Sequence, residues 1–147
     1  MAKKKKKKKE KYSSEIINLE LMEEICTIKT KNLGAFVLAN FENSETDGLG
    51  NIFIDNGGDI LGVAHSDNYG TDYGGNNTHF NIIENRIYNA SLDDRAGVYI
   101  LLDLLPKLNI KCDVLITIDE EIGASSAQLF ETEKEYNWMF EFDRTGK

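Results

Sequence analysis

The segment ITIDEEIGASSA, residues 116–127, places three carboxylates side by side, Asp119, Glu120 and Glu121, at the end of an apolar run. Neighbouring like charges repel one another, so acids gathered where a strand leaves a core need a positive partner. The chemistry that these residue types support depends on which other polar side chains lie close to them in the folded chain.

A histidine and two further acids take equivalent positions in the sequence. His65 ends the apolar segment DILGVAH, Asp93 opens a predicted helix, and Asp143 ends the segment WMFEFD. Functional sites of open α/β sheets lie at the carboxyl ends of the strands. One imidazole and several carboxylates at such an edge form a mixed nitrogen and oxygen ligand set that suits Zn²⁺ or a neighbouring divalent ion. A pair of metal ions is therefore our interpretation of these acids.

Each of these residues also has an ordinary structural explanation. A histidine on a strand is often a hydrogen-bonded core residue, and Asp93 and Asp94 are favoured as helix caps. The two glutamates fit a solvated turn, and Asp143 fits an exposed strand end. Short motifs taken singly have a high false-positive rate. It is the joint placement of five such residues at strand ends and helix starts that favours the metal site.

Hydrophobic periodicity indicates elements that could position these residues. Apolar residues recur at helical spacing over residues 14–27, behind the cap candidates Ser13 and Ser14, and again over residues 93–108. A hairpin with its turn at ENR is predicted over residues 78–91, a loop over 68–77 and a short helix over 125–133. The segment 34–43 fits a helix or a strand. Strands are expected at residues 50–58, 59–65, 112–119 and 138–143, the third of them central. Alternating strands and helices indicate a layered α/β domain.

Composition excludes several classes of protein. The chain has 147 residues, 41% of them hydrophobic, which is enough for one domain with a core. No apolar run reaches the roughly 18 residues of a membrane span, and no apolar segment of a secretory signal follows the first lysines. Cys26 and Cys112 form no CxxC motif, so reduced thiols and a cytoplasmic location are expected, with no membrane partner.

The charge is distributed unevenly along the chain. Residues 1–11 carry eight lysines and one glutamate, a net charge of +7, whereas the other 136 residues carry nine Lys and Arg against 24 Asp and Glu, a net charge of −15. Seven consecutive lysines bury nothing, so we expect residues 1–11 to form a disordered tail ahead of a domain over residues 12–147. The tail fits a nucleic-acid or anionic-surface tether, but a solubilising role or contact with the acidic body is favoured. The charge of the body argues against a nucleic-acid partner.

Four motifs together, AHSD, SLDDRAG, TIDEEIG and FEFDRTG, resemble those of the co-catalytic di-zinc exopeptidases. That clan includes zinc aminopeptidases, glutamyl-type aminopeptidases and the tripeptidase and carboxypeptidase-G group. The resemblance extends from about Tyr12 to the last residue. It implies an α/β fold with a mixed β-sheet flanked by helices, and hydrolysis of a peptide or related amide bond by a metal-activated water.

The resemblance also implies a role for each motif residue. His65 and Asp143 correspond to ligands of the first metal, Asp93 to the carboxylate that bridges both metals, and Glu121 to a ligand of the second. Glu120 corresponds to the general base, and Asp67 to the acid that orients the histidine. The implied cofactor is one or two Zn²⁺ ions, with Co²⁺ or Mn²⁺ as alternatives. Asp94 and Asp119 have no ligand role and are expected to cap the helix and form the turn.

The chain departs from the family pattern in two ways. The second metal of the family also takes a histidine near the carboxyl end, whereas the only other histidine here, His79, is in the wrong place and is interpreted as structural. The chain also ends soon after Asp143, so it resembles the amino-terminal part of such a domain, truncated, incomplete or one half of a split protein. Activity of the chain alone is expected to be low. The alternative is a non-catalytic remnant that binds metal or a partner, and the expected partners are a peptide or amide substrate, a complementing chain or a second copy.

Overall fold

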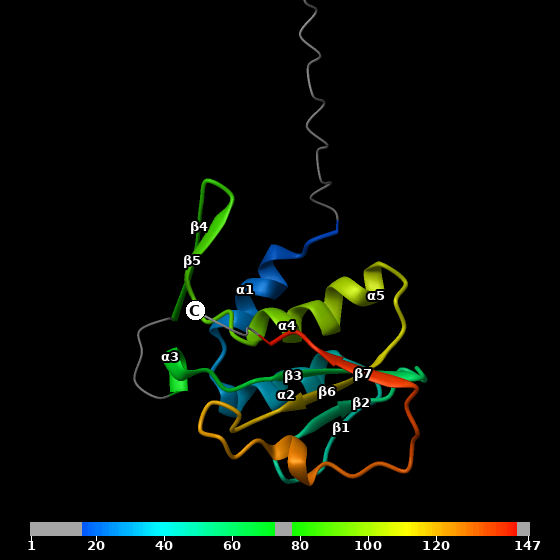
Figure 1. The fold of residues 1–147 in the computed structure, drawn as a ribbon. Coiled ribbons are helices and arrows are strands. Elements are labelled where there is room, and N and C mark those ends of the chain that lie inside the picture. Colours follow the sequence, from blue (N-terminus) through cyan, green and yellow to red (C-terminus); the bar gives the residue numbers. More distant parts are fainter. Residues whose placement is uncertain (1–15, 73–77, 144–147) are drawn as a thin grey trace, which may run out of the picture.

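A computed structural model of the chain describes residues 16–72 and 78–143 (Figure 1). The lysine tail, the boundary expected after residue 11 and the cap candidates Ser13 and Ser14 lie outside the described residues. Within them, a mixed sheet packs against a layer of helices, and a small hairpin stands apart from the sheet (Figure 1). The α/β class with a mixed sheet and flanking helices is confirmed.

Five strands form the main sheet in the order β1-β2-β6-β3-β7. β1 and β2 are antiparallel to one another, as are β2 and β6, whereas β3 runs parallel to both β6 and β7. The central strand β6 is buried along its whole length, as its continuous apolar run predicted. In sheet order, the strands are Ser44–Thr46, Ile52–Ile54, Asp113–Thr117, Ile60–His65 and Trp138–Glu141.

The hydrophobic core lies between one face of this sheet and the helices. Paired residues of neighbouring strands point to the same face, so Ile52, Ile116 and Ala64 form one row of that face. The helices add Val37 and Val98, both completely buried. The elements that supply this layer are α1 (Leu19–Thr27), α2 (Thr30–Asn40), α4 (Arg95–Tyr99), the π-helical turn η1 (Ile100–Leu104) and α5 (Leu105–Lys107).

The predicted hairpin is formed by β4 (Thr78–Ile83) and β5 (Arg86–Ala90), which pair only with one another among the described strands. Its turn residues Glu84 and Asn85 have φ values of 51° and 63°. Two consecutive residues with positive φ match the twist of a two-residue hairpin. The hairpin projects from the body and contacts it through α1 (Figure 1).

Several predicted boundaries differ from the structure for physical reasons. The helix predicted over residues 93–108 begins at Arg95 and widens into η1, where the Leu105 N–H donates to the Ile100 carbonyl. Pro106 has no N–H and its ring crowds the preceding turn, which the wider π-helical turn accommodates. The ambiguous segment 34–43 belongs mostly to α2. The loop predicted over residues 68–77 contains the short helix α3 (Tyr69–Asp72).

The remaining predicted helix, over residues 125–133, is a single 3₁₀ turn, η2 (Ser126–Leu129), that begins at the Ser125 cap. Of the helix predicted over residues 14–27, the structure shows α1, with the Asn18 side chain as its cap. None of the helices in the described parts of the chain is long and apolar enough to cross a membrane.

Candidate metal centre

The predicted site residues meet at one edge of the sheet. His65 is the last residue of β3 and pairs with Thr117, the last residue of β6. β7 runs parallel to them, and Asp143 lies two residues beyond its end. Asp93 lies just before α4, which packs on β3. This is the edge at which α/β sheets hold their functional groups, because parallel strands all finish there.

Three carboxylates surround the outer nitrogen of the His65 ring. Nε2 lies 3.8 Å from Oδ1 of Asp93, 3.8 Å from Oε2 of Glu120 and 3.9 Å from Oδ1 of Asp143. One ligand atom from each of His65, Asp93 and Asp143 lies within 4.8 Å of the other two. Ligand atoms bound tetrahedrally to zinc at about 2.0–2.2 Å lie somewhat closer than this, about 3.4 Å apart, so small side-chain movements would complete a site.

The inner nitrogen of His65 fixes the tautomer of the ring. Nδ1 lies 3.0 Å from the backbone carbonyl oxygen of Asp67 and 3.5 Å from its Oδ1. Both neighbours are acceptors, so Nδ1 carries the proton and Nε2 presents its lone pair to the three acids. Burial opposes a charge on His65, but the hydrogen bond and charge of Asp67, together with Asp94, raise its pKa to about 9. The field that favours a second proton on Nε2 favours a metal cation in the same place.

The Asp67 carboxylate joins the end of β3 to the turn after β6. Its oxygens accept hydrogen bonds from the backbone N–H groups of Glu120, at 3.3 Å, and Glu121, at 3.0 Å. Burial opposes ionisation of Asp67, yet the hydrogen bonds from His65 and from these N–H groups keep its pKa below the ordinary value. Asp67 therefore contacts both the imidazole and the backbone that carries the two glutamates.

The turn after β6 explains how the side chains of the adjacent residues Glu120 and Glu121 reach different partners. β6 ends at Thr117, and Asp119 and Gly123 have φ values of 63° and 71°. The Gly123 N–H donates to the Glu120 carbonyl at 2.8 Å, which closes the turn. Glu120 reaches toward His65, whereas Oε1 of Glu121 accepts a hydrogen bond from the Tyr69 N–H at 3.3 Å. Residue Asp119 takes the turn-forming position expected of it.

Asp93 supplies the strongest sign that a cation fits. Its Oδ1 is buried and has no hydrogen-bond partner among the described residues, although Oδ1 is the atom that faces His65 Nε2. A buried carboxylate oxygen without a partner is costly unless a proton or a metal ion satisfies it. The Asn68 side chain donates to the Asp93 backbone carbonyl and so holds this segment in place. The donor set of one imidazole nitrogen and several carboxylate oxygens fits Zn²⁺.

Asp94 differs from its expected role as a helix cap. It occupies the cap position of α4, but its side chain makes no capping hydrogen bond and is 1% exposed. The carboxylate instead packs against Gly97, where an added Cβ would overlap it. Burial raises the pKa of Asp94 to about 8; the charge of His65 opposes this shift, and Glu141 and Asp143 add to it.

Glu141 is a further acid that the sequence did not single out. Burial, with the charge of Asp143 next in importance, raises its pKa above the ordinary value. Neighbouring acids therefore add to the cost of ionising Asp94 and Glu141, which a bound cation would offset. The only signal for Glu141 in the sequence is its place two residues before Asp143.

A sequence model of the M42 glutamyl aminopeptidase family matches residues 22–145, most of the chain. The chain belongs to this family. The matched range contains every residue of the metal centre described above, and the M42 family is a family of co-catalytic zinc exopeptidases, as the resemblance of the four motifs implied. Comparisons with curated proteins and with solved structures returned no match.

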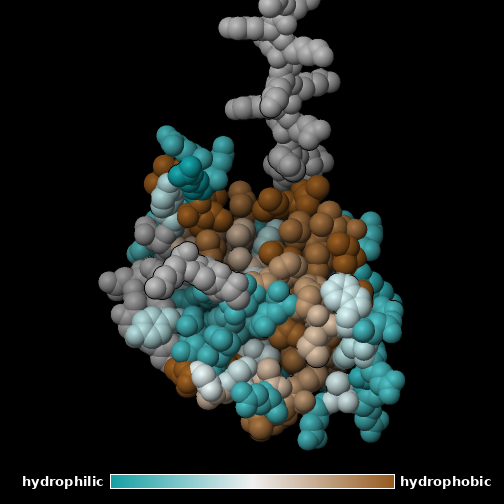
Figure 2. Space-filling model, viewed as in Figure 1, coloured by the Kyte–Doolittle hydropathy of each residue, from teal (hydrophilic) through white to brown (hydrophobic). Residues whose placement is uncertain are grey.

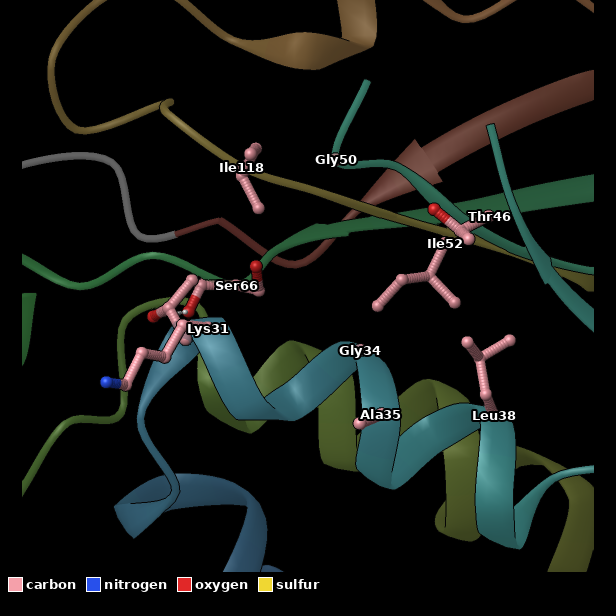
Figure 3. Close-up of a pocket in the computed structure, with 10 residues that line it drawn as sticks. Lys31, Gly34, Ala35, Leu38, Thr46, Gly50, Ile52, Ser66 and Ile118 are labelled. Atoms are coloured by element: carbon pink, nitrogen blue, oxygen red, sulfur yellow. Dashed lines mark hydrogen bonds between the residues drawn. The ribbon is translucent and has the colours of Figure 1, made fainter. Parts of the chain in front are cut away.

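Two hollows lie near the metal centre of this M42 family member. One, of about 410 Å³, adjoins Asp93 and has Leu92, Ala96 and Phe142 among its walls. The other, of about 360 Å³, lies between α2 and the ends of β2 and β6 and is lined by Ile52, Ile118 and other residues (Figure 3). None of the three acids around His65 Nε2 lines the second hollow, and only Asp93 lines the first. In Figure 2, hydrophilic residues gather at the end of the sheet near α3, whereas apolar residues lie over α1 and α5.

The second histidine, His79, which the sequence indicated was structural and not a ligand, lies apart from this centre. It is exposed on β4, in the hairpin. This position agrees with the prediction that His79 does not join the other ligands. Because its side chain is exposed, the structural role expected of it is not one in the core. Both cysteines are free and buried, as expected for reduced thiols.

Proposed function

We propose that this M42 family member is a metal-dependent aminopeptidase-type hydrolase whose first metal, Zn²⁺ with Co²⁺ or Mn²⁺ as alternatives, is held by His65, Asp93 and Asp143. The observation that carries this proposal is the convergence of three carboxylates on His65 Nε2, one of them with a buried, unpartnered oxygen. The family match supports the class of reaction. The expected location remains the cytoplasm, and the substrate is a peptide or related amide.

Glu120 is the proposed general base. Its carboxylate lies on the open side of the centre, with 43% of the side chain exposed, 3.8 Å from His65 Nε2. When bound, a divalent ion lowers the pKa of water and polarises the scissile carbonyl. Glu120 takes the proton of the attacking water and returns it to the leaving amine, which is a transfer that a carboxylate within hydrogen-bond reach can make.

Asp67 acts through its neighbours. Its carboxylate lies 3.5 Å from Nδ1 of His65 and accepts hydrogen bonds from the backbone N–H groups of Glu120 and Glu121. Partners of this kind orient a metal-bound histidine and raise its basicity. The hollow beside Asp93 is the space that the scissile peptide would occupy, because it opens next to a proposed ligand and has apolar walls from Leu92 and Phe142.

Glu121 and Asp93 are proposed to hold a second, weaker ion. Glu121 accepts a hydrogen bond from the Tyr69 N–H and is absent from the one group of three close donors found among the described residues. That grouping favours one well-held ion over two. It also keeps a second candidate function open, a module that binds a single metal ion and catalyses nothing.

Hydrolysis of aminoacyl p-nitroanilides separates these two functions. The chain is stripped with a chelator, reloaded with Zn²⁺ and assayed alone and fused to the carboxyl-terminal part of an M42 family member, where the family supplies a further histidine. Glu120→Gln should lower the rate by roughly 10²- to 10⁴-fold while zinc stays bound. Glu121→Gln should weaken metal uptake first, with activity restored by excess zinc. Full activity in Glu120→Gln would refute the base, and zinc binding without hydrolysis in either form would favour the binding module.

A further inference from the structure

Arg95 is the largest of the fully buried side chains, with 1% of its surface exposed, yet the proposed chemistry does not use it. Its guanidinium donates to three elements at once. Nε donates to the Ser66 backbone carbonyl, Nη1 to the Ile25 carbonyl at 2.7 Å and Nη2 to Oγ1 of Thr30 at 2.8 Å. Since none of these three acceptors is a carboxylate, the usual reason to bury an arginine, a direct ion pair, does not apply here.

The three acceptors lie at element ends that surround the metal-binding segment. Ile25 lies in the last turn of α1, where carbonyls lack helical partners and a cation is favoured. Thr30 begins α2, and Ser66 follows His65 directly. Figure 3 shows Ser66 beside the first turn of α2, marked by Lys31, at one end of the second hollow.

A second hydrogen-bond path leads from Arg95 to the other side of the same segment. The Thr30 hydroxyl, which accepts from Arg95, lies 2.5 Å from Oδ2 of Asp72, to which it donates. That same Asp72 oxygen accepts from the Asn68 N–H at 2.9 Å. Asn68 in turn donates from its side chain to the Asp93 carbonyl. Residues 66–68, with Asp67 between two tethered neighbours, are thus held from both ends by contacts that lead back to Arg95.

We propose that Arg95 is a positioning residue for the metal centre, because it fixes the backbone of residues 66–68 and through it the directions of His65, Asp67 and Asp93. The proposal rests on the metal centre of the proposed function. It does not require hydrolysis, since a misplaced histidine and carboxylate weaken the metal site itself. Partners behind metal ligands are worth about 10- to 100-fold in affinity.

If Arg95 only stabilised the fold, its replacement would lower stability without changing the geometry at the metal. The test therefore compares two variants that are both expected to be less stable than the unchanged chain. Arg95→Lys keeps the charge but has one donor group that cannot reach three elements. Val37→Ala removes buried volume from the same helix as Thr30, about two turns further along α2, and Val37 contributes no hydrogen-bonding side chain to residues 66–68. Zinc affinity is measured by competition with a chromophoric chelator, and the Co²⁺-loaded proteins are compared by their visible d–d absorption, well below each melting temperature.

Arg95→Lys should bind zinc about 10- to 100-fold more weakly and show a changed Co²⁺ spectrum, whereas Val37→Ala should match the unchanged chain in both. If Arg95→Lys fails to fold, Thr30→Val, which removes only the hydroxyl relay, should give a smaller loss of affinity in the same direction. Unchanged affinity and spectrum in the folded arginine or threonine variant would overturn the positioning role, as would equal losses in Val37→Ala. Zinc binding by the unchanged chain without hydrolysis would refute the hydrolase and leave the role of Arg95 intact, whereas no zinc binding would refute both.

Discussion

The carboxylate of Asp67 accepts a hydrogen bond from the backbone N–H of Glu121 across 3.0 Å, which ties the end of β3 to the turn after β6. Its other oxygen accepts from the Glu120 N–H and lies 3.5 Å from Nδ1 of His65. The same buried side chain therefore contacts the imidazole and the backbone of both glutamates. The proposed ligand and the proposed base are held in one arrangement by protein contacts alone.

Replacing Asp67 with asparagine should weaken metal binding. An amide has only one acceptor oxygen. Its NH₂ group would therefore face one of the three N–H groups that now point at the carboxylate, those of Glu120, Glu121 and the His65 ring. We expect zinc affinity to fall by roughly 10- to 100-fold while the chain stays folded. Chelator competition measures the affinity, with the exposed Glu45→Gln on β1 as the matched control for loss of one negative charge. Zinc binding by Asp67→Asn at the strength of the unchanged chain would show that this acid does not position the site.

Gly97 should be sensitive to alanine because of its contact with Asp94. An added Cβ would overlap the Asp94 carboxylate, which is buried and has little room to move. Overpacking of this kind typically costs about 1–3 kcal/mol. We expect Gly97→Ala to lower the free energy of unfolding by that amount, measured by urea denaturation.

Gly34, half-buried in α2, provides the control for that measurement. There an added Cβ would meet only Cδ1 of Ile52, at an ordinary 3.7 Å. Alanine is the better helix former by about 1 kcal/mol, so Gly34→Ala should leave stability unchanged or raise it. Equal effects of the two substitutions would mean that the crowding around Asp94 is not what Gly97 relieves.

Cys26 should be inert in the folded chain. It is 1% exposed, and burial raises the pKa of its thiol to about 11, although Arg95 opposes the shift. Only the thiolate reacts with disulfide reagents. We expect no labelling of either cysteine by Ellman's reagent at pH 8 until denaturant is added, when both react. Rapid labelling of the native protein would show that α1 opens readily.

The same shift gives a pH dependence of stability. The pKa of the folded thiol, about 11, lies above the ordinary cysteine pKa of 9.0, at which an unfolded thiol ionises. The unfolded chain therefore loses a proton first, and raising the pH above about 9 favours unfolding by the contribution of this group. Cys26→Ala should reduce that alkaline loss of stability; an unchanged pH profile in this variant would assign the loss to other groups.

Parts of this fold with strong local patterns were predictable from the sequence. The apolar runs that end at His65 and before Asp119 became the parallel strands β3 and β6, and the ENR turn became the hairpin. Because parallel strands end at one edge, the meeting of His65 and Asp143 followed from topology before any distance was known, whereas Asp93 is brought there by α4, which packs on β3. α2 was ambiguous because Gly34 interrupts its pattern; its helical nature comes from Leu33 and Val37, buried one turn apart.

What the sequence did not reveal depends on burial of polar groups. The pattern of an aspartate before a helix predicts a capping residue. No neighbouring residue type in the sequence indicates that the Asp94 side chain is instead buried and makes no capping hydrogen bond. Arginine is ordinarily exposed, so the three-way contact of Arg95 has no local signal either. Gly97, three residues after Asp94, is the one hint of close packing there. Likewise, the acceptor nearest to His65 Nδ1 is the Asp67 backbone carbonyl, and the carboxylate serves chiefly the N–H groups of the glutamates.

Calorimetric titration of the chelator-stripped chain with Zn²⁺ tests the central claim most directly. His65, Asp93 and Asp143 form one group of close donors, so we predict one zinc ion bound tightly per chain, a second bound weakly, and loss of the tight site in His65→Ala. Two equally tight equivalents would contradict the ligand assignment. Absence of tight binding, or a tight site that survives in His65→Ala, would contradict the metal centre itself.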